Sequence, residues 1–211
     1  MNGNGVLVRD RLYIGGEWVA PHSGRVIQSI DPSTEEVWAH VAEADEADID
    51  RAVSAARAAL SGPWSRMEPT RRGAILYRLA QLLLANAKTL AEIESRDNGK
   101  PIKDTLGEMQ RAADWLTFFA GAADKVNGAQ IPFKTDMLAY TRREPVGVVG
   151  AILPWNSPIL LCCWKLGPAL AAGNTMVIKP AEQTPASSLE LAKLAEEAGV
   201  PPGVVNVCPG Y

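Results

Sequence analysis

The chain has few of the residues that build metal sites and disulfide frameworks. Its 211 residues include three cysteines and two histidines. Two of the cysteines, Cys162 and Cys163, are neighbours inside an apolar stretch, which is not a disulfide framework. The histidines, His22 and His40, show no zinc-ligand spacing. The sequence therefore predicts neither a metal site nor a fold held by disulfides.

Excess charge of one sign and long apolar runs are also scarce. The formal net charge is -3, and the basic residues are dispersed, which is not the electrostatic footprint of a nucleic-acid-binding protein. Apolar stretches are interrupted well before the ~20 residues needed to span a bilayer. Met1 to Leu12 contains no apolar segment typical of a signal peptide. We therefore expect a cytoplasmic protein whose partners include neither nucleic acid nor a membrane.

The stretch from Glu144 to Pro185 organises the rest of the chain. It opens with the apolar, β-branched run Val146 to Leu153, which is bounded by prolines and predicts a buried strand. A helical pattern follows, in which Ser157 can cap the helix and Pro158 suits its first position. The pattern continues to Gly173, where the helix can end.

Two more strands alternate with a second helix. Thr175 to Ile178 is apolar and β-branched, Thr184 followed by a proline starts a helix, and Val204 to Val207 is a third strand. This βαβαβ order predicts an α/β fold with a Rossmann-like parallel sheet and flanking helices. Ligands of such sheets bind at the carboxyl ends of the strands, which are followed here by residues 153–158 and 179–185.

The chain before this unit begins with short strands and continues with helices. A hairpin over 11–20 and strands over 26–30 and 37–41 predict a small β layer. Helical patterns begin at Asp45, near Pro69, at Thr89 and at Ile102, and they form a layer against the sheet. Turn residues between Asn127 and Arg143 predict an extended, strand-like excursion.

The polar residues of the two candidate segments allow two interpretations each. The Asn156 amide either ties the turn together or donates to a developing oxyanion. Lys179 and Glu182 are either a solvated charge pair or ligands of ribose hydroxyls. Cys162 and Cys163 are interpreted as small core residues, since a catalytic thiolate needs exposure and a lowered pKa. No G-x-G-x-x-G motif follows any of the strands, so a standard Rossmann pyrophosphate loop is not predicted.

Several linked motifs resemble the amino-terminal, cofactor-binding half of the NAD(P)-dependent aldehyde dehydrogenase family. In chain order they occupy residues 13–18, 31–34, 97–101, 154–158, 164–174, 179–185 and 201–207. They cover nearly the whole chain. Their shared order and spacing make the resemblance far more specific than one short pattern.

The resemblance implies a mechanism and a cofactor site. In the family a cysteine thiolate attacks the aldehyde, hydride passes to the nicotinamide, and a glutamate-activated water hydrolyses the thioester. Carried over by position, Asn156 donates its amide to the oxyanion. A carboxylate at Glu182 favours NAD over NADP, because a 2′-phosphate would meet a like charge. Cofactor contacts are implied for Ile152, Leu153, Pro154, Trp155, Lys179, Pro180, Ala181 and Glu182.

The resemblance also divides the chain into three parts. Residues 1–126 are expected to be strands and helices of the cofactor-binding domain, and 146–211 its βαβαβ core, which is incomplete. Residues 127–145 resemble the strands through which family members form homodimers or homotetramers. Ser157 stands where the family often has Phe, at a position implied to line the substrate tunnel beside Trp164, so a polar wall is expected there.

The catalytic cysteine and glutamate of the family are expected beyond residue 211, and the family's short Gly-containing segment near the pyrophosphate is missing. We therefore expect an oxidoreductase that converts an aldehyde to a carboxylic acid, with activity in the complete protein and the 211-residue chain inactive alone. Two alternatives remain at this point. One is a non-catalytic nucleotide-binding or interaction fragment, and the other is a related acyl-phosphate reductase.

Overall fold

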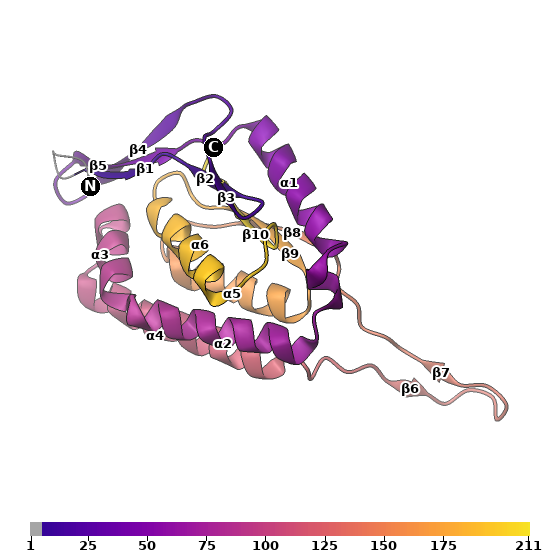
Figure 1. The fold of residues 1–211 in the computed structure, drawn as a ribbon. Helices are drawn as coiled ribbons and strands as arrows, with labels where there is room; N and C mark the ends of the chain where they lie inside the picture. Colours follow the sequence, from indigo (N-terminus) through magenta and orange to yellow (C-terminus); the bar gives the residue numbers. More distant parts are fainter. Residues whose placement is uncertain (1–5) are drawn as a thin grey trace.

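The centre of the molecule is a five-stranded sheet in the order β3-β2-β10-β9-β8 (Figure 1). The computed structural model describes residues 6–211. Strands β8, β9 and β10 are parallel, and β2 and β3 form an antiparallel hairpin at one side. The strands are β2 (Leu12–Ile14), β3 (Glu17–Val19), β8 (Val148–Ile152), β9 (Thr175–Lys179) and β10 (Val205–Val207). The predicted α/β fold with a parallel βαβαβ unit is confirmed.

Helices cover both faces of this sheet. α5 (Pro158–Ala171) and α6 (Ala186–Ala198) connect the parallel strands and pack on one face with Met176 and Ile178. Helix α1 (Glu46–Leu60) packs on the other face, where Val177 lies in a second apolar cluster. Met176 and Ile178 thus lie on one face of β9 and Val177 on the other, because successive side chains of a strand point to opposite faces.

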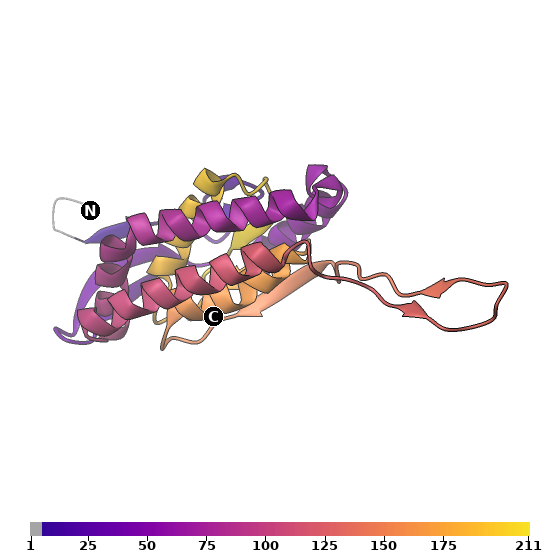
Figure 2. The same cartoon turned by 90° about the horizontal axis from the view of Figure 1, so that it is seen from below.

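Three more helices form an outer layer over α5 and α6. The prediction that they pack against the sheet is wrong, because α5 and α6 lie between them and the strands. The three helices are α2 (Pro69–Ala85), α3 (Ala87–Asn98) and α4 (Ile102–Ala122), and a short 3₁₀ helix (Pro63–Arg66) precedes them. Figure 2 shows α2 and α4 side by side. Their backbones approach closely at Gly73, where an added Cβ would lie 2.4 Å from the Ala120 carbonyl oxygen. Helix α3 begins at Ala87, two residues before the predicted start at Thr89, because Asn86 ends α2 and begins α3 directly.

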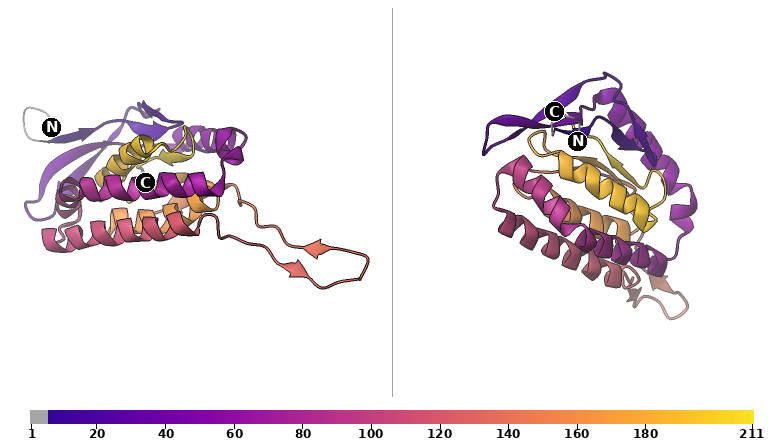
Figure 3. Two further views of the ribbon diagram at one scale, coloured as in Figure 1. Left: turned by 60° about the horizontal axis from the view of Figure 1, so that its bottom comes forward. Right: turned by 60° about the vertical axis from the view of Figure 1, so that its left-hand side comes forward.

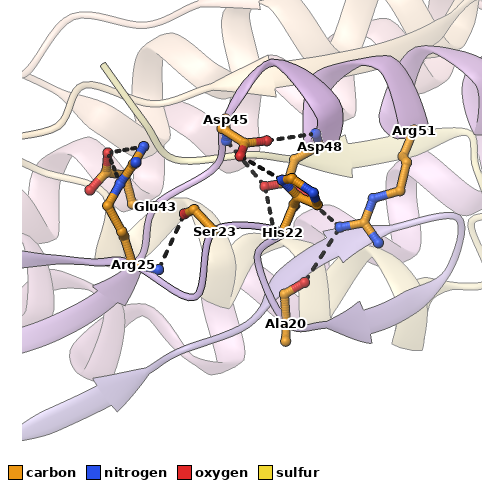
Figure 4. Close-up of polar contacts among 8 residues, drawn as sticks. All are labelled: Ala20, His22, Ser23, Arg25, Glu43, Asp45, Asp48 and Arg51. Carbon is orange, nitrogen blue, oxygen red and sulfur yellow. Dashed lines mark hydrogen bonds and ion pairs between the residues drawn. The ribbon is translucent and has the colours of Figure 1, made fainter.

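A separate sheet with the order β1-β5-β4 lies at the amino-terminal side. It consists of β1 (Leu7–Arg9), β4 (Val26–Asp31) and β5 (Glu36–Ala42). The start of α1 ties this region to the main sheet (Figure 4). There Asp45 and Asp48 form a capping box, and the buried Asp48 carboxylate also accepts from the His22 amide and from Arg51. The capping predicted for Asp45 is confirmed.

Two predictions about the strands are wrong. The hairpin over 11–20 does not join the small β layer, because Tyr13 of β2 pairs with Val207 and extends the main sheet. Strand β8 is not buried, because it lies at the edge of the sheet and, within residues 6–211, pairs with β9 alone. Consequently, Val146 before the strand is 92% exposed and Ile152 at its end is 77% exposed.

The predicted extended excursion is confirmed as a hairpin that projects from the body (Figure 1, Figure 3). It contains β6 (Gln130–Ile131) and β7 (Ala139–Tyr140), paired antiparallel. Its exposed apolar side chains are Ile131, Phe133, Met137, Leu138 and Tyr140. Within residues 6–211, no helix combines the length and apolar character that crossing a membrane requires.

Candidate functional site

The two segments expected to carry the chemistry meet at the carboxyl edge of the parallel sheet. The Leu153 amide donates to the Lys179 carbonyl oxygen at 3.0 Å and joins them. Beside this junction lies a cavity of about 510 Å³. It is lined by Ile27, Gln28, Ser29, Ile30, Pro32, Asp97, Asn98, Trp155, Glu182, Gln183, Thr184 and Tyr211. The cavity thus includes Trp155 and Glu182, which were predicted, and a wall from β4 and α3, which was not.

One face of β8 and β9 is open near this edge. Gly150 and Ile152 pair with Val177 and Lys179, so these four residues share the face on which α1 packs. An added Cβ on Gly150 meets no atom within 4 Å. The side chain of Ile152 is mostly exposed, whereas Val177 is buried. The sheet therefore offers a flat, partly apolar surface at the carboxyl end of β8.

Lys179 and Glu182 lie beside this surface and contact each other. The Lys179 ammonium donates to one carboxylate oxygen of Glu182 at 3.1 Å, and Gln183 donates to the other at 2.9 Å. Both side chains are partly exposed, at 24% and 30%. A backbone hydrogen bond and the Lys179 contact lower the pKa of Glu182, so this carboxylate is ionised at neutral pH. An ionised, accessible carboxylate is suited to accept hydrogen bonds from hydroxyl groups.

The other residues expected at the cofactor differ in what they expose. Pro154 and Trp155 are exposed, and Trp155 is 58% accessible. Leu153, Pro180 and Ala181 are buried.

Asn156 lies in the turn between β8 and α5, and its residue is exposed. Its carbonyl oxygen accepts from the Lys100 ammonium at 2.6 Å and lies 2.7 Å from the Ser157 hydroxyl oxygen. No residue within 6–211 makes a recorded hydrogen bond to the Asn156 side-chain amide. The backbone of Asn156 is therefore held in place, while its side-chain amide is free to bind another group.

Ser157 does not cap α5, so this prediction is wrong. Its residue is 7% exposed, and its hydroxyl lies 2.9 Å from a Glu108 carboxylate oxygen and 3.0 Å from the Lys100 ammonium. The α5 amide of Ile159 donates instead to Glu94 of α3 at 2.6 Å. The Ser157 hydroxyl is thus engaged with a buried carboxylate and is not available to the helix. Pro158 occupies the first helical turn, as predicted.

Helix α3 supplies two buried carboxylates that the sequence reasoning missed. Glu94 binds the start of α5, and Asp97 accepts from the Ala186 amide of α6 at 3.0 Å and from the Ser29 hydroxyl at 2.5 Å. Burial raises the pKa of each carboxyl group to about 7. The available signal was their spacing, since Leu90, Glu94 and Asp97 recur at helical intervals on an otherwise apolar face.

Trp164 of α5 is 45% exposed and contacts α4. Its ring centroid lies 5.6 Å from that of Trp115, which is itself 5.3 Å from Phe119 and 6.4 Å from Phe118. The α4–α5 surface is therefore aromatic near Trp164 and polar near Ser157.

The interpretation of the cysteines as core residues is confirmed. Cys162, Cys163 and Cys208 are each at most 1% exposed. Burial raises the pKa of Cys162 and Cys208 to about 12, and it raises the pKa of Cys163 well above its usual value. Such thiols are neutral at physiological pH and cannot act as exposed nucleophiles. In the part of the chain from residue 6 onward, no three His, Cys, Asp or Glu side chains are grouped to hold a metal.

The sequence and the fold match a known family. A model of the aldehyde dehydrogenase family matches residues 18–211. The chain belongs to the aldehyde dehydrogenase family. Aldehyde dehydrogenase 1A1 of Mesocricetus auratus is 48% identical over 204 residues, which are 95% of this chain and 41% of that protein. The mitochondrial aldehyde dehydrogenase of Homo sapiens is 48% identical over 205 residues, which are 96% of this chain and 40% of that protein.

Solved aldehyde dehydrogenases have the same fold over this segment. The NAD+ complex of aldehyde dehydrogenase from Bacillus cereus superposes with a TM-score of 0.94 at 47% identity, over 96% of this chain and 42% of that one. An indole-3-acetaldehyde dehydrogenase complexed with NAD+ gives a TM-score of 0.95 at 45% identity, over 99% of this chain and 42% of that one. The chain thus spans about two fifths of the length of the aldehyde dehydrogenases it matches.

Proposed function

We propose that this segment is the cofactor-binding part of an enzyme that oxidises an aldehyde to a carboxylic acid with NAD+. The observation that carries the proposal is the juxtaposition of an exposed Asn156 on an anchored turn with the open face of β8 and β9. Family membership supports the reaction class. The nucleophilic cysteine and the base of the family are proposed to lie outside these 211 residues, because the cysteines present here are buried.

In this proposal Asn156 stabilises the negative charge that forms on the aldehyde oxygen. A side-chain amide is effective in this role when its position is fixed before the reaction, because no reorganisation is then needed as charge develops. The anchoring of the Asn156 carbonyl oxygen at 2.6 Å supports such a role.

The open face of β8 and β9 fits a dinucleotide. Ile152 offers apolar surface, and Gly150 leaves the backbone accessible where a side chain would fill the space. Lys179 and Glu182 are proposed to hold the hydroxyls of the adenosine ribose. When bound, NAD+ supplies the acceptor for the hydride that leaves the substrate carbon. The ionised Glu182 favours NAD over NADP, because a 2′-phosphate would be repelled.

The substrate is proposed to approach along α5, past Ser157 and Trp164. Trp164 offers an exposed ring for an apolar substituent. The small Ser157, paired with buried charge, makes the wall next to Asn156 more polar than a phenylalanine would. This arrangement favours aldehydes that have a polar group close to the reacting carbon.

Assembly into a homodimer or homotetramer is proposed to use the β6–β7 hairpin. Its exposed apolar residues support this, since such groups on a projecting hairpin are typical of an interaction site. A cytoplasmic location remains a proposal. It agrees with the 47% identical cytosolic aldehyde dehydrogenase 1 of Mus musculus, whereas other relatives of similar identity are mitochondrial.

The alternative is a nucleotide-binding module without catalysis. The burial of all three cysteines favours this role for the 211-residue chain when it acts alone. An acyl-phosphate reductase activity has no observation in its favour beyond the shared fold.

Aldehyde-dependent formation of NADH by the complete polypeptide in which this segment occurs naturally tests the proposal. We expect Asn156→Ala to lower kcat by about 100- to 1000-fold, with the Kd for NAD+ changed less than about twofold. Gln81→Ala, at an exposed amide side chain of α2, is the matched control and should leave kcat unchanged. Equal losses of kcat and NAD+ affinity for Asn156→Ala would contradict the oxyanion role. Binding of NAD+ without turnover of any aldehyde would favour the alternative.

A further inference from the structure

Lys100 connects the turn after α3 to the start of α5. It follows Gly99, which ends α3 in the left-handed conformation with a φ of 74°. The Lys100 amide donates to the Asn98 side chain at 2.9 Å, which fixes the direction in which the chain leaves the helix. From there the Lys100 side chain, 24% exposed, reaches across to Asn156 and Ser157. It therefore bridges two segments that are 56 residues apart in the sequence.

Each of the three donors of the Lys100 ammonium has an acceptor. These acceptors are the Asn156 carbonyl oxygen at 2.6 Å, a Glu108 carboxylate oxygen at 2.6 Å and the Ser157 hydroxyl at 3.0 Å. An ammonium group has three N–H donors and no acceptor, so this set is complete. The bond to Glu108 is charge-assisted, which makes it stronger than a bond between neutral groups.

The bridge rests on a buried carboxylate. Glu108 of α4 is 6% exposed, and the same oxygen that binds Lys100 lies 2.9 Å from the Ser157 hydroxyl. On the far side of the turn, Glu94 accepts from the Ile159 amide. The backbone from 156 to 159 is thus held at one end by Lys100, from the connection between α3 and α4, and at the other by Glu94 of α3. In this stretch only Asn156 is exposed.

We propose that Lys100 is a positioning residue that acts through Asn156. By holding the carbonyl oxygen of Asn156, it sets the orientation of that residue's peptide group and thereby the direction of its side-chain amide. The inference rests on the proposed oxyanion role of Asn156. Small errors in the placement of such a group cost large factors in rate, because the amide must meet the oxygen on which charge develops.

A double-mutant cycle in the complete polypeptide tests this role. We expect Lys100→Met to lower kcat by about 10- to 100-fold, with the aldehyde KM and the NAD+ Kd changed less than about twofold. In an Asn156→Ala background, the same substitution should change kcat less than about twofold, because its effect passes through Asn156. Lys103→Met, at an exposed lysine nearby, is the control and should leave kcat unchanged in both backgrounds.

The outcomes separate the inference from the proposed function. If Asn156→Ala is strongly impaired and Lys100→Met lowers kcat by the same factor in both backgrounds, the positioning role is overturned and the oxyanion role stands. If Asn156→Ala turns over normally, the proposed function and the positioning role are both overturned. In Lys100→Met the buried Glu108 carboxylate keeps only Arg111, at 3.8 Å, as a charged partner. The Lys100→Met/Glu108→Met variant removes both charges of the Lys100–Glu108 pair and repeats the cycle in a protein expected to be more stable.

Hydrogen exchange on the 211-residue chain provides a readout that does not depend on catalysis. Lys100→Met should accelerate amide exchange in residues 155–161 by about tenfold or more, with exchange at 186–190 unchanged. Equal acceleration in both segments would show general destabilisation and overturn the positioning role. Unchanged exchange in 155–161 would overturn it as well.

Discussion

The amino-terminal ends of α5 and α6 are built alike and used differently. Each helix follows a parallel strand, each has a proline at its start, and each has an amide bound by a carboxylate of α3. At α5 the turn leaves Asn156 exposed beside the open face of β8. At α6 the corresponding turn includes Thr184, which is 1% exposed and lies under β4 at the wall of the cavity.

At both helices, the residues that bind the helix end are not the residues of the preceding turn. Neither helix uses a serine or threonine of its own turn as its cap. Because α3 provides the caps, the turn residues are available for other contacts. The Ser157 hydroxyl binds Glu108 instead of the helix end. The side-chain amide of Asn156 does not bind the helix end either, and the residue is exposed.

Removal of the α3 carboxylates is expected to have the largest effect on stability. Asp97→Ala leaves the Ala186 amide without an acceptor, and it leaves the Ser29 hydroxyl with only the Gln183 carbonyl oxygen at 3.5 Å. We therefore expect the free energy of unfolding to fall by roughly 2 to 5 kcal/mol. Glu94→Ala should lower the free energy of unfolding by a similar amount, because the Ile159 amide and the Ser187 hydroxyl lose Glu94 as their acceptor. Urea denaturation of both variants measures these values.

Hydrogen exchange then distinguishes the two ends. Asp97→Ala should accelerate exchange at the start of α6 alone. Glu94→Ala should affect both helices, because Glu94 also accepts from Ser187 of α6 at 3.1 Å. Identical exchange patterns in the two variants would contradict the assignment of one cap to each helix.

The buried carboxyl groups also predict a dependence of stability on pH. The pKa of Glu94 is about 7 in the folded chain, against an ordinary value of 4.5. The folded state therefore holds this proton more tightly than the unfolded state, and the resulting stability is fully present below pH ~4.5 and is lost as pH rises through 7. Glu94→Gln retains an accepting oxygen without the ionisation. We expect it to reduce the loss of stability between pH 5 and 8 by at most roughly 3 kcal/mol, measured by urea denaturation.

The hydroxyl groups of the two turns are expected to have the smallest effects. Ser157→Ala removes a hydrogen bond to Glu108 and should cost about 1 kcal/mol. Thr184→Val should be neutral, because the buried Thr184 hydroxyl has no recorded partner within residues 6–211. Thermal unfolding of the two variants side by side measures the difference. A larger loss for Thr184→Val would show that this hydroxyl has a partner, such as a buried water molecule.

Much of this architecture could be predicted from local patterns. The β-branched runs, the helical spacing and the glycine stops specify the βαβαβ unit, since each depends on neighbouring residues in the chain. The prediction for Ser157 was wrong because its partner, Glu108, comes from a helix 49 residues earlier. Likewise, the strand at 146–153 was expected to be buried from its composition, which does not reveal whether a strand lies at the edge of a sheet.

The candidate site shows the same limit. Asn156 and Glu182 could be proposed as site residues, because they follow strands whose carboxyl ends meet at one edge and because they match the motifs of the family. Their roles stay a prediction. Lys100 could not, because its contact with Asn156 joins segments 56 residues apart. For Glu94 and Asp97 the helical spacing was a signal, but their partners at the starts of α5 and α6 depend on tertiary structure. Glu94 and Asp97 are buried, and only the tertiary contacts show which amides they bind.

The unpaired edge of β8 should make self-association of the chain depend on its concentration. Among the residues described, its outer side has no strand partner, and Val146 and Ile152 expose apolar side chains at its two ends. Unpaired backbone groups next to apolar side chains are a template onto which a strand of another molecule can add. Dilute samples of the 211-residue chain should therefore contain single molecules, and concentrated ones should contain strand-paired associations whose amount grows with time.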